Sequence, residues 1–213
     1  MCQGHSALKL PQNMTFTETN LKGAYVVRLK NIEDERGYFA RAWCHQEFGQ
    51  QNLNPAMVQM NVGFSHHRGT VRGMHYQMAP HAEVKYIRCT RGAIYDVIID
   101  LRDGSPTFGL WHGQELTADN GLMLYAPEGF AHGYQTLQDS TEMFYLTSAS
   151  YAPSAARGVR HDDPAFSVRW PLPVTFISAA DRQWPAFKRQ PSGGQSESQR
   201  FHNHNSDQTE IKI

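Results

Sequence analysis

Short segments in which apolar and polar residues alternate recur along most of the chain, and residues that favour turns separate them. The predicted strands lie at residues 24–29, 58–62, 84–90, 93–100, 110–116, 122–126, 133–137 and 143–147. No long segment with the 3.6-residue period of an amphipathic helix lies between residues 58 and 147. The pattern therefore predicts an all-β fold, either an antiparallel sandwich or a barrel.

The segments that flank this region are less regular. The turn Asp34-Glu35-Arg36-Gly37 between residues 24–29 and 38–43 predicts a β-hairpin. Residues 44–53 have room for one or two helical turns, which a following proline ends. Residues 175–182 are expected to form a last short segment that packs on the barrel.

Both ends of the chain differ in composition from the middle. Residues 1–15 are polar and predict an N-terminal arm. In residues 188–213 the large apolar side chains are Phe201, Ile211 and Ile213 alone. Such a segment cannot bury enough surface to offset its ordering entropy, so a disordered tail is expected. One domain is therefore predicted over residues 16–187.

Charge and cysteine content narrow the class of protein. The 213 residues include 20 basic and 20 acidic side chains with no block of like charge, which argues against nucleic acid or an anionic membrane as a partner. Cys2, Cys44 and Cys89 are odd in number and lack CxxC spacing, which fits a reducing compartment. No signal-like start and no run of 18 apolar residues occurs, so we expect a cytoplasmic protein.

One stretch, Arg72-Gly73-Met74-His75-Tyr76-Gln77, places an imidazole beside a fixed cation, and Lys85 follows ten residues after His75. An imidazole base with an ammonium near the oxygen that becomes negative is suited to removing a proton from a carbon acid. The competing interpretation is that His75 is a structural residue of a half-buried strand.

A second stretch has the spacing Pro127-x-Gly129-x-x-His132, which resembles the second signature box of the cupins. The first cupin box normally supplies His-x-His and a Glu, and here that place is His75-Tyr76-Gln77. Two histidines without a nearby carboxylate ligand make a poor metal site, so no metal is predicted.

Nine separated motifs, in order and with near-family spacing, resemble the nucleotide-diphosphate 4-keto-6-deoxysugar 3,5-epimerases. They are DERGYFAR (34–41), VQMN (58–61), VRGMHYQ (71–77), VKYIR (84–88), RGAIYDVIIDLRDGSPTFG (91–109), PEGFAHGY (127–134), MFYLT (143–147), YAPSAARGVRHDDP (151–164) and ISAAD (177–181). The resemblance implies a cupin-type jelly roll, a homodimer that exchanges N-terminal strands, a nucleotide-sugar substrate and no cofactor.

The resemblance also implies roles for single residues. His75 corresponds to the general base, and Asp181 to the carboxylate that orients it. Lys85 corresponds to the amine beside the C4 carbonyl, and Tyr145 to the acid on the opposite face of the sugar. The expected substrate-binding residues are Arg72, His132, Gln59 and Asn61, together with Arg36, Phe39 and Arg41 near the N-terminus. Epimerisation next to a ketone needs a base, an acid and an oxyanion partner, and each is present.

Four positions depart from the family on the nucleotide side, namely Arg41, Ser150, Ala156 and Ala180. Arg41 stands where the thymidine enzymes commonly have a Glu. An arginine has only donors, which suit the acceptors of cytosine or guanine, so a CDP- or GDP-linked sugar is one hypothesis. The other is that Arg41 pairs with a phosphate or an acidic neighbour.

Three further functions are left open by the sequence. The altered nucleotide side is compatible with an epimerase or isomerase that acts at a single carbon or on a related keto-sugar. A metal-dependent cupin enzyme is a second alternative, against which the missing His-x-His argues. A non-catalytic sugar-nucleotide binder is the third, against which the intact catalytic set argues.

Overall fold

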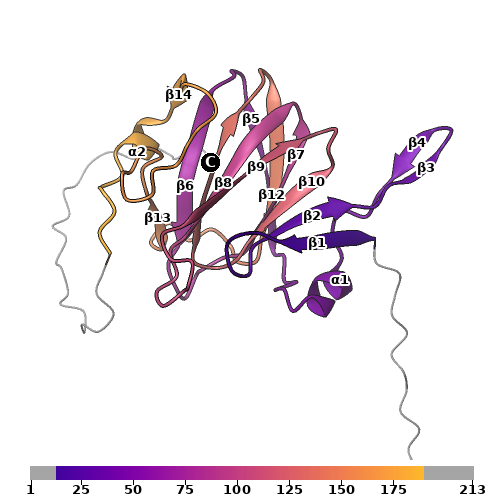
Figure 1. Cartoon of the computed structure of the whole chain (residues 1–213), viewed down its shortest axis with the longest axis horizontal. Helices are drawn as coiled ribbons and strands as arrows, with labels where there is room; N and C mark the ends of the chain where they lie inside the picture. The colour runs from indigo at the N-terminus through magenta and orange to yellow at the C-terminus, as the bar shows by residue number, and fades with distance from the viewer. Residues whose placement is uncertain (1–12, 190–213) are drawn as a thin grey trace, which may run out of the picture.

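The structure, a computed structural model, describes residues 13–189, in which two β-sheets lie face to face (Figure 1). The first sheet has the order β1 (Met14–Glu18), β2 (Tyr25–Leu29), β10 (Leu122–Ala126), β7 (Lys85–Arg91), β12 (Thr141–Thr147), β5 (Gln59–Ser65). The second has the order β13 (Ala156–Gly158), β6 (Thr70–Gln77), β11 (Phe130–Thr136), β8 (Ala93–Asp100), β9 (Trp111–Thr117), with β14 (Phe176–Ile177) beside β6. The predicted all-β architecture of the jelly-roll type is confirmed.

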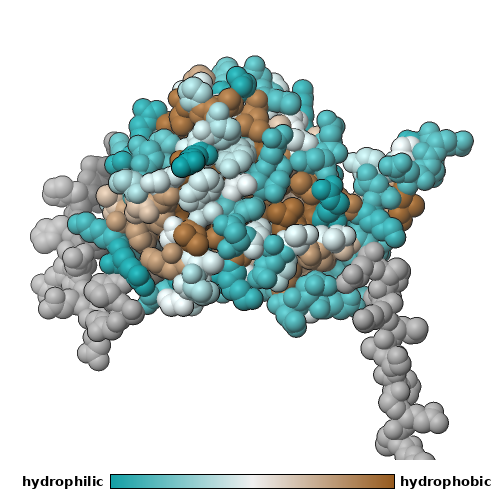
Figure 2. Space-filling view, viewed as in Figure 1, coloured by the Kyte–Doolittle hydropathy of each residue, from teal (hydrophilic) through white to brown (hydrophobic). Residues whose placement is uncertain are grey.

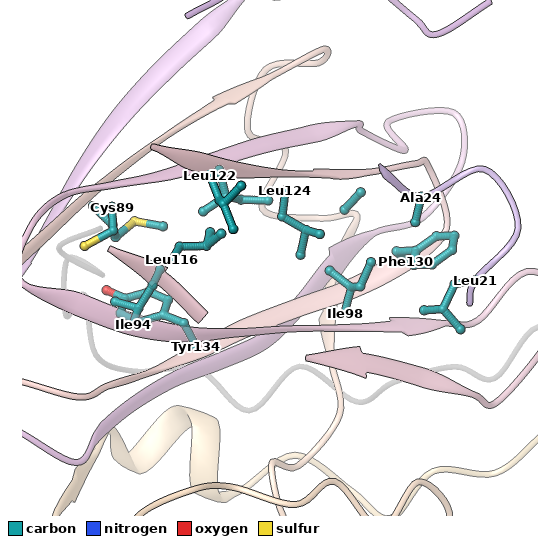
Figure 3. Close-up of a cluster of buried hydrophobic side chains, with 13 residues drawn as sticks. Leu21, Ala24, Cys89, Ile94, Ile98, Leu116, Leu122, Leu124, Phe130 and Tyr134 are labelled. Carbon is teal, nitrogen blue, oxygen red and sulfur yellow. The ribbon is translucent and has the colours of Figure 1, made fainter. Parts of the chain in front are cut away.

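The main hydrophobic core fills the space between the two sheets (Figure 3). Its members come from both sheets, because each strand sends alternate side chains inward. They include Leu21, Ile87, Cys89, Ile94, Ile98, Leu116, Leu124, Phe130 and Tyr134. Tyr145 is only partly buried and packs against this cluster. The candidate acid therefore lies at the margin of the core.

The outer face of the second sheet is covered by the chain that follows β13. Val159 and Phe166 are buried there against Val97 and Ile99 of β8. Strand β8 is buried on both faces, which explains its nearly continuous apolar sequence. The same covering chain leads to β14 and α2 (Ala179–Arg182) beside β6, as Figure 1 shows. The last segment expected from the sequence is thereby confirmed.

Helix α1 (His45–Gln50) contributes to covering the outer face of the first sheet, and it confirms the helical turns expected at residues 44–53. Phe48 of this helix is fully buried, with its ring centroid 4.9 Å from that of Tyr86 and 5.3 Å from that of Phe16. Strand β5 is at the edge of this sheet, and alternate side chains on it remain exposed.

The N-terminal hairpin differs from the prediction. Strand β2 pairs with β1 and β10, and not with residues 38–43. The hairpin forms instead between β3 (Ile32–Asp34) and β4 (Gly37–Phe39), and all six of these residues are exposed. It projects away from the two sheets (Figures 1 and 2). The turn was recognisable from its residues, but the pairing of β2 depends on partners distant in sequence.

The predicted N-terminal arm and C-terminal tail lie almost entirely outside the described residues, although β1 already begins at Met14. Among residues 13–189, no helix has both the length and the apolar character needed to cross a membrane.

Candidate active site

Two histidines lie opposite each other on neighbouring strands of the second sheet. His75 of β6 is the register partner of His132 of β11, and Arg72 is the partner of Tyr134. Between these two pairs β6 advances by three residues while β11 advances by two, so β6 contains a β-bulge. Because cross-strand partners share a face, the bulge brings Arg72 and His75 to the same face. Regular alternation would have put them on opposite faces.

Gly73 makes this bulge possible. Its φ is +120°, a backbone conformation that residues with a side chain rarely adopt. A Cβ atom at this position would lie 2.5 Å from the Cα of Gly133 and 2.8 Å from the carbonyl oxygen of His132. The close approach of β6 to β11 therefore requires a glycine here, and the positions of the flanking Arg72 and His75 depend on it.

The imidazole of His75 is paired with the carboxylate of Asp181, as expected from the sequence. The Nε2 atom of His75 lies 2.5 Å from Oδ1 of Asp181, and Oδ2 accepts a hydrogen bond of 3.3 Å from the Gly73 N–H. Ser178 caps α2 by accepting from the Asp181 N–H at 3.0 Å, which places the carboxylate beside β6. Burial alone would raise the pKa of Asp181, but the hydrogen bond and charge of His75 outweigh it and lower that pKa.

Lys85 at the start of β7 is buried in the first sheet and reaches across to the second. Its Nζ donates to the carbonyl oxygen of His75 at 3.1 Å. It also lies 3.0 Å from Oε1 of Glu83, and both side chains are about one-tenth exposed. The amine is therefore next to the histidine on which the predicted chemistry depends. Glu83 was missed by the sequence analysis, because a Glu two residues before a Lys ordinarily indicates an exposed strand end.

Tyr145 of β12 lies on the same face of the first sheet as Lys85. Tyr145 pairs with Asn61, and the next residue on that face, Thr147, pairs with both Lys85 and Gln59. The Gln59 amide donates to Asn61 Oδ1 at 2.9 Å. Burial, followed by the charge of Glu83, raises the pKa of Tyr145, so the phenol is protonated at neutral pH.

Arg72 connects the two sheets. Its Nη2 donates to the carbonyl oxygen of Phe64 at 3.0 Å, and its Nε donates to Ser65 Oγ at 3.3 Å, both on β5. We call the polar region between the two sheets, at the margin of the hydrophobic core, the inter-sheet site. It is defined by Arg72, His75 and His132 on the second sheet and by Asn61, Lys85 and Tyr145 on the first.

His132 is held by a second buried carboxylate. Its Nε2 lies 2.7 Å from Oδ1 of Asp96 on β8, while Oδ2 of Asp96 is buried without a hydrogen-bond partner. Burial raises the pKa of Asp96, and the charges of His132 and Lys85 oppose this rise. The sequence analysis missed Asp96 as well. An Asp in the middle of the apolar run Ile94–Asp100 was the available signal, because a charge is rarely buried without a partner.

Three predicted substrate-binding residues lie apart from the inter-sheet site of their own chain. Arg36 and Phe39 are on the projecting hairpin, where Arg36 forms an ion pair of 2.5 Å with Asp34. Arg41 follows the hairpin and lies 3.1 Å from the buried carboxylate of Glu47. The structure of one chain therefore brings eight of the eleven predicted residues together, and it leaves these three elsewhere.

Among residues 13–189, no group of three or more His, Cys, Asp or Glu side chains is arranged to hold a metal ion. His66 and His67 follow directly after β5 and are exposed, and His67 stacks on Phe176 with ring centroids 4.6 Å apart.

Comparison with known proteins finds sequence matches that cover most of the described residues. The sequence model of the family described as dTDP-4-dehydrorhamnose 3,5-epimerase matches residues 18–189. A relative of that description from Sinorhizobium fredii is 39% identical over 174 residues, covering 81% of this chain and 89% of the relative.

Solved structures agree with these sequence matches. A dTDP-4-dehydrorhamnose 3,5-epimerase from Elizabethkingia anophelis has a TM-score of 0.80 at 36% identity, covering 83% of this chain and 97% of that one. A dTDP-6-deoxy-D-glucose-3,5-epimerase from Legionella pneumophila, in complex with dTDP-4-keto-L-rhamnose, has a TM-score of 0.74 at 30% identity. The alignment with the second structure covers 79% of this chain and 89% of that one.

Proposed function

This chain belongs to the dTDP-4-dehydrorhamnose 3,5-epimerase family and is a carbohydrate epimerase, and from that premise we propose how its side chains act. The substrate is a nucleotide-diphosphate-linked 4-keto-6-deoxysugar, and the reaction inverts C3, C5 or both. The observation that supports this proposal is the inter-sheet site, in which the His75–Asp181 pair and Tyr145 come from facing sheets.

The proposed reaction proceeds in two proton transfers. His75 removes a proton from the carbon next to the ketone, and the electron pair of the broken C–H bond forms the enolate. The Lys85 ammonium stabilises the negative charge that develops on the C4 oxygen. Tyr145, which its raised pKa keeps protonated, then delivers a proton to the opposite face of the same carbon. The carbon is inverted without a net change in oxidation state, so the scheme uses no cofactor.

Deuterium incorporation from heavy water tests the proposal directly. The enzyme is incubated with 4-keto-6-deoxyhexoses carrying dTDP, CDP or GDP, and the products are analysed by mass spectrometry. Two deuterons per sugar are expected for inversion at both carbons, and one deuteron for inversion at a single carbon. His75→Ala should abolish incorporation. Absence of exchange with every member of the panel, or unchanged exchange by His75→Ala, would overturn the proposal.

The identity of the nucleotide depends on what Arg41 contacts. In the structure its Nη1 is 3.1 Å from Oε1 of Glu47, whose other oxygen accepts from the Asn13 N–H at 2.8 Å. This contact supports the second of the two hypotheses above, in which Arg41 pairs with an acidic neighbour. A dTDP-linked sugar is therefore the first substrate to test, with CDP and GDP as competitors. Tighter binding of CDP or GDP than of dTDP would support the direct contact of Arg41 with the base.

We also propose that two copies of the chain exchange the N-terminal segment that carries β3 and β4. Phe39 is 71% exposed in the single chain, and Arg36 and Phe39 lie apart from the inter-sheet site. Strand β5 has a free edge among the described strands, and Val58 just before it and Met60 and Val62 on it are 60–66% exposed. The exposed hairpin and the exposed strand are of the kind that would cover each other in a dimer.

A mixing experiment tests whether each site is shared between two chains. Arg36→Ala and His75→Ala should each be inactive when expressed alone. If the hairpin of one copy completes the site of the other, coexpression should restore about one quarter of the wild-type activity, because half of the dimers are mixed and each has one intact site. Failure to restore activity, or a monomer in light scattering, would contradict the exchange.

A further inference from the structure

Glu83 lies inside the inter-sheet site, and no step of the reaction described so far uses it directly. Its carboxylate is about one-tenth exposed, and Oε1 lies 3.0 Å from Nζ of Lys85. A buried ion pair is costly to desolvate, and it is tolerated when further hydrogen bonds satisfy the remaining polar atoms. The surroundings of Glu83 supply such bonds.

Gln77 at the end of β6 holds the second oxygen of Glu83. Its Nε2 lies 2.9 Å from the carbonyl oxygen of His81, 3.2 Å from Glu83 Oε2 and 3.3 Å from the carbonyl oxygen of Ser150. Its Oε1 accepts a hydrogen bond of 2.6 Å from the Ala152 N–H, and the side chain is only 4% exposed. Glu83 is therefore fixed from two sides, by Lys85 and by a glutamine that is itself anchored to residues 150–152.

The contacts of Lys85 show what this fixation achieves. An ammonium has three N–H donors and no acceptor. Two of them are directed to Glu83 Oε1 and to the carbonyl oxygen of His75, at 3.0 and 3.1 Å. One N–H is thus left for a ligand, and its direction is determined by the other two. Asp96 of β8 also interacts electrostatically with Lys85 across the site.

We propose that Glu83 is a positioning residue of the epimerisation. Its carboxylate, held by Gln77, orients the Lys85 ammonium so that the remaining N–H is directed at the carbonyl oxygen of the sugar. This inference rests on the proposed function, because it assigns Lys85 to that oxygen. The charge of Glu83 has a second effect, since after burial it is the next cause that raises the pKa of Tyr145. Glu83 thereby supports both the oxyanion partner and the acid.

Glu83→Gln tests the proposal, because it retains the shape of the side chain and removes its charge. We expect kcat to fall about 10- to 100-fold with KM changed less than about twofold, since a displaced donor weakens the transition state more than the ground state. Because Glu83 raises the pKa of Tyr145, the alkaline limit of kcat should move to lower pH. Glu115→Gln on the exposed face of β9 is the matched control and should behave as wild type. An unchanged kcat and pH profile for Glu83→Gln would overturn the proposal.

A second measurement does not depend on turnover. Amine acetylation followed by peptide mass spectrometry compares the labelling of Lys85 with that of the exposed Lys30. The ratio should rise at least about threefold in Glu83→Gln, because the amine loses the partner that holds it. An unchanged labelling ratio would refute the positioning role of Glu83, whether or not any substrate of the panel is turned over. Absence of turnover with the whole panel would instead refute the proposed function. If Glu83→Gln does not fold, Glu83→Asp retains the charge with a shorter reach, and the same increase in labelling is expected.

Discussion

Replacing Asp181 with Asn should impair the reaction by changing which nitrogen of His75 carries the proton. The Gly73 N–H donates to Oδ2 of Asp181, so an asparagine would direct its amide oxygen to Gly73. Its amide NH₂ would then face Nε2 of His75, which lies 2.5 Å from Oδ1 in the wild type. An imidazole that accepts at Nε2 carries its proton on Nδ1. Nδ1 is the ring nitrogen that has no hydrogen bond to residues 13–189, and it would no longer accept a proton from the substrate.

The expected fall in kcat has two causes, the weakened hydrogen bond to His75 and the unfavourable tautomer of its imidazole. A hydrogen bond between a charged pair contributes about 1.5–3 kcal/mol, which corresponds to about 10- to 100-fold in rate. The unfavourable tautomer adds to this loss, so we expect kcat to fall about 10²- to 10⁴-fold. KM should change little, because the aspartate is not expected to contact the substrate.

The assay is the rate of deuterium incorporation under saturating substrate, with binding of the nucleotide sugar followed by calorimetry. Asp162→Asn is the matched control, because Asp162 is exposed and pairs with Arg160 at 2.9 Å on the same covering segment. The control should retain its rate to within about twofold. If Asp181→Asn reached one third of the wild-type rate, the dyad would not be part of the chemistry.

Three further substitutions test the fold and the site. Gly73→Ala should cost about 3 kcal/mol or more in urea unfolding and abolish turnover, because its Cβ would lie 2.5 Å from backbone, whereas Gly49→Ala in α1 should be neutral or stabilising. Asp100→Asn should cost about 2 kcal/mol at pH 7, because burial is outweighed by hydrogen bonds that lower the pKa of Asp100 to about 2. That stability is present above about pH 4 and is lost as the pH falls through the folded pKa, so the difference in unfolding free energy from wild type should shrink in acid. Asp119→Asn, at an exposed position, is the control and should keep wild-type stability at pH 7. Tyr145→Phe should incorporate deuterium without inversion, because His75 can return a proton only to the face from which it removed one, and normal product formation would contradict the role of the acid.

The strands of the two sheets were predicted well because the sequence pattern that indicates a strand is local. In β7, β8 and β12 the alternation, the β-branched residues and the flanking turns all indicate the same state. The hairpin at residues 32–39 shows where such reasoning stops. Its turn is encoded by local residues, but the partners of β2 are β1 and β10, and β10 lies about a hundred residues away in the chain. No local pattern specifies a choice between two strands of similar composition.

In the candidate site too, residues in local motifs were predicted and residues that depend on distant contacts were not. His75, Lys85, Asp181 and Tyr145 were found because they occur in motifs, and the structure brings them to one region. Asp96 was not identified, because its importance arises from burial next to His132, and a single Asp in a strand carries no sign of that neighbour. Contacts across strands therefore had to come from the three-dimensional arrangement.

Two of the four positions that depart from the family lie next to the side chains that hold Lys85. Ser150 and Ala156 both adjoin Gln77, the first through its carbonyl oxygen at 3.3 Å and the second as its register partner on β13. Gln77 in turn holds Glu83, and Glu83 holds Lys85. Two side chains, Gln77 and Glu83, therefore link residues 150–156 to the amine of Lys85. If residues 150–156 contact the base, as the family resemblance implies, this network couples the binding of the nucleotide to the deprotonation of the sugar.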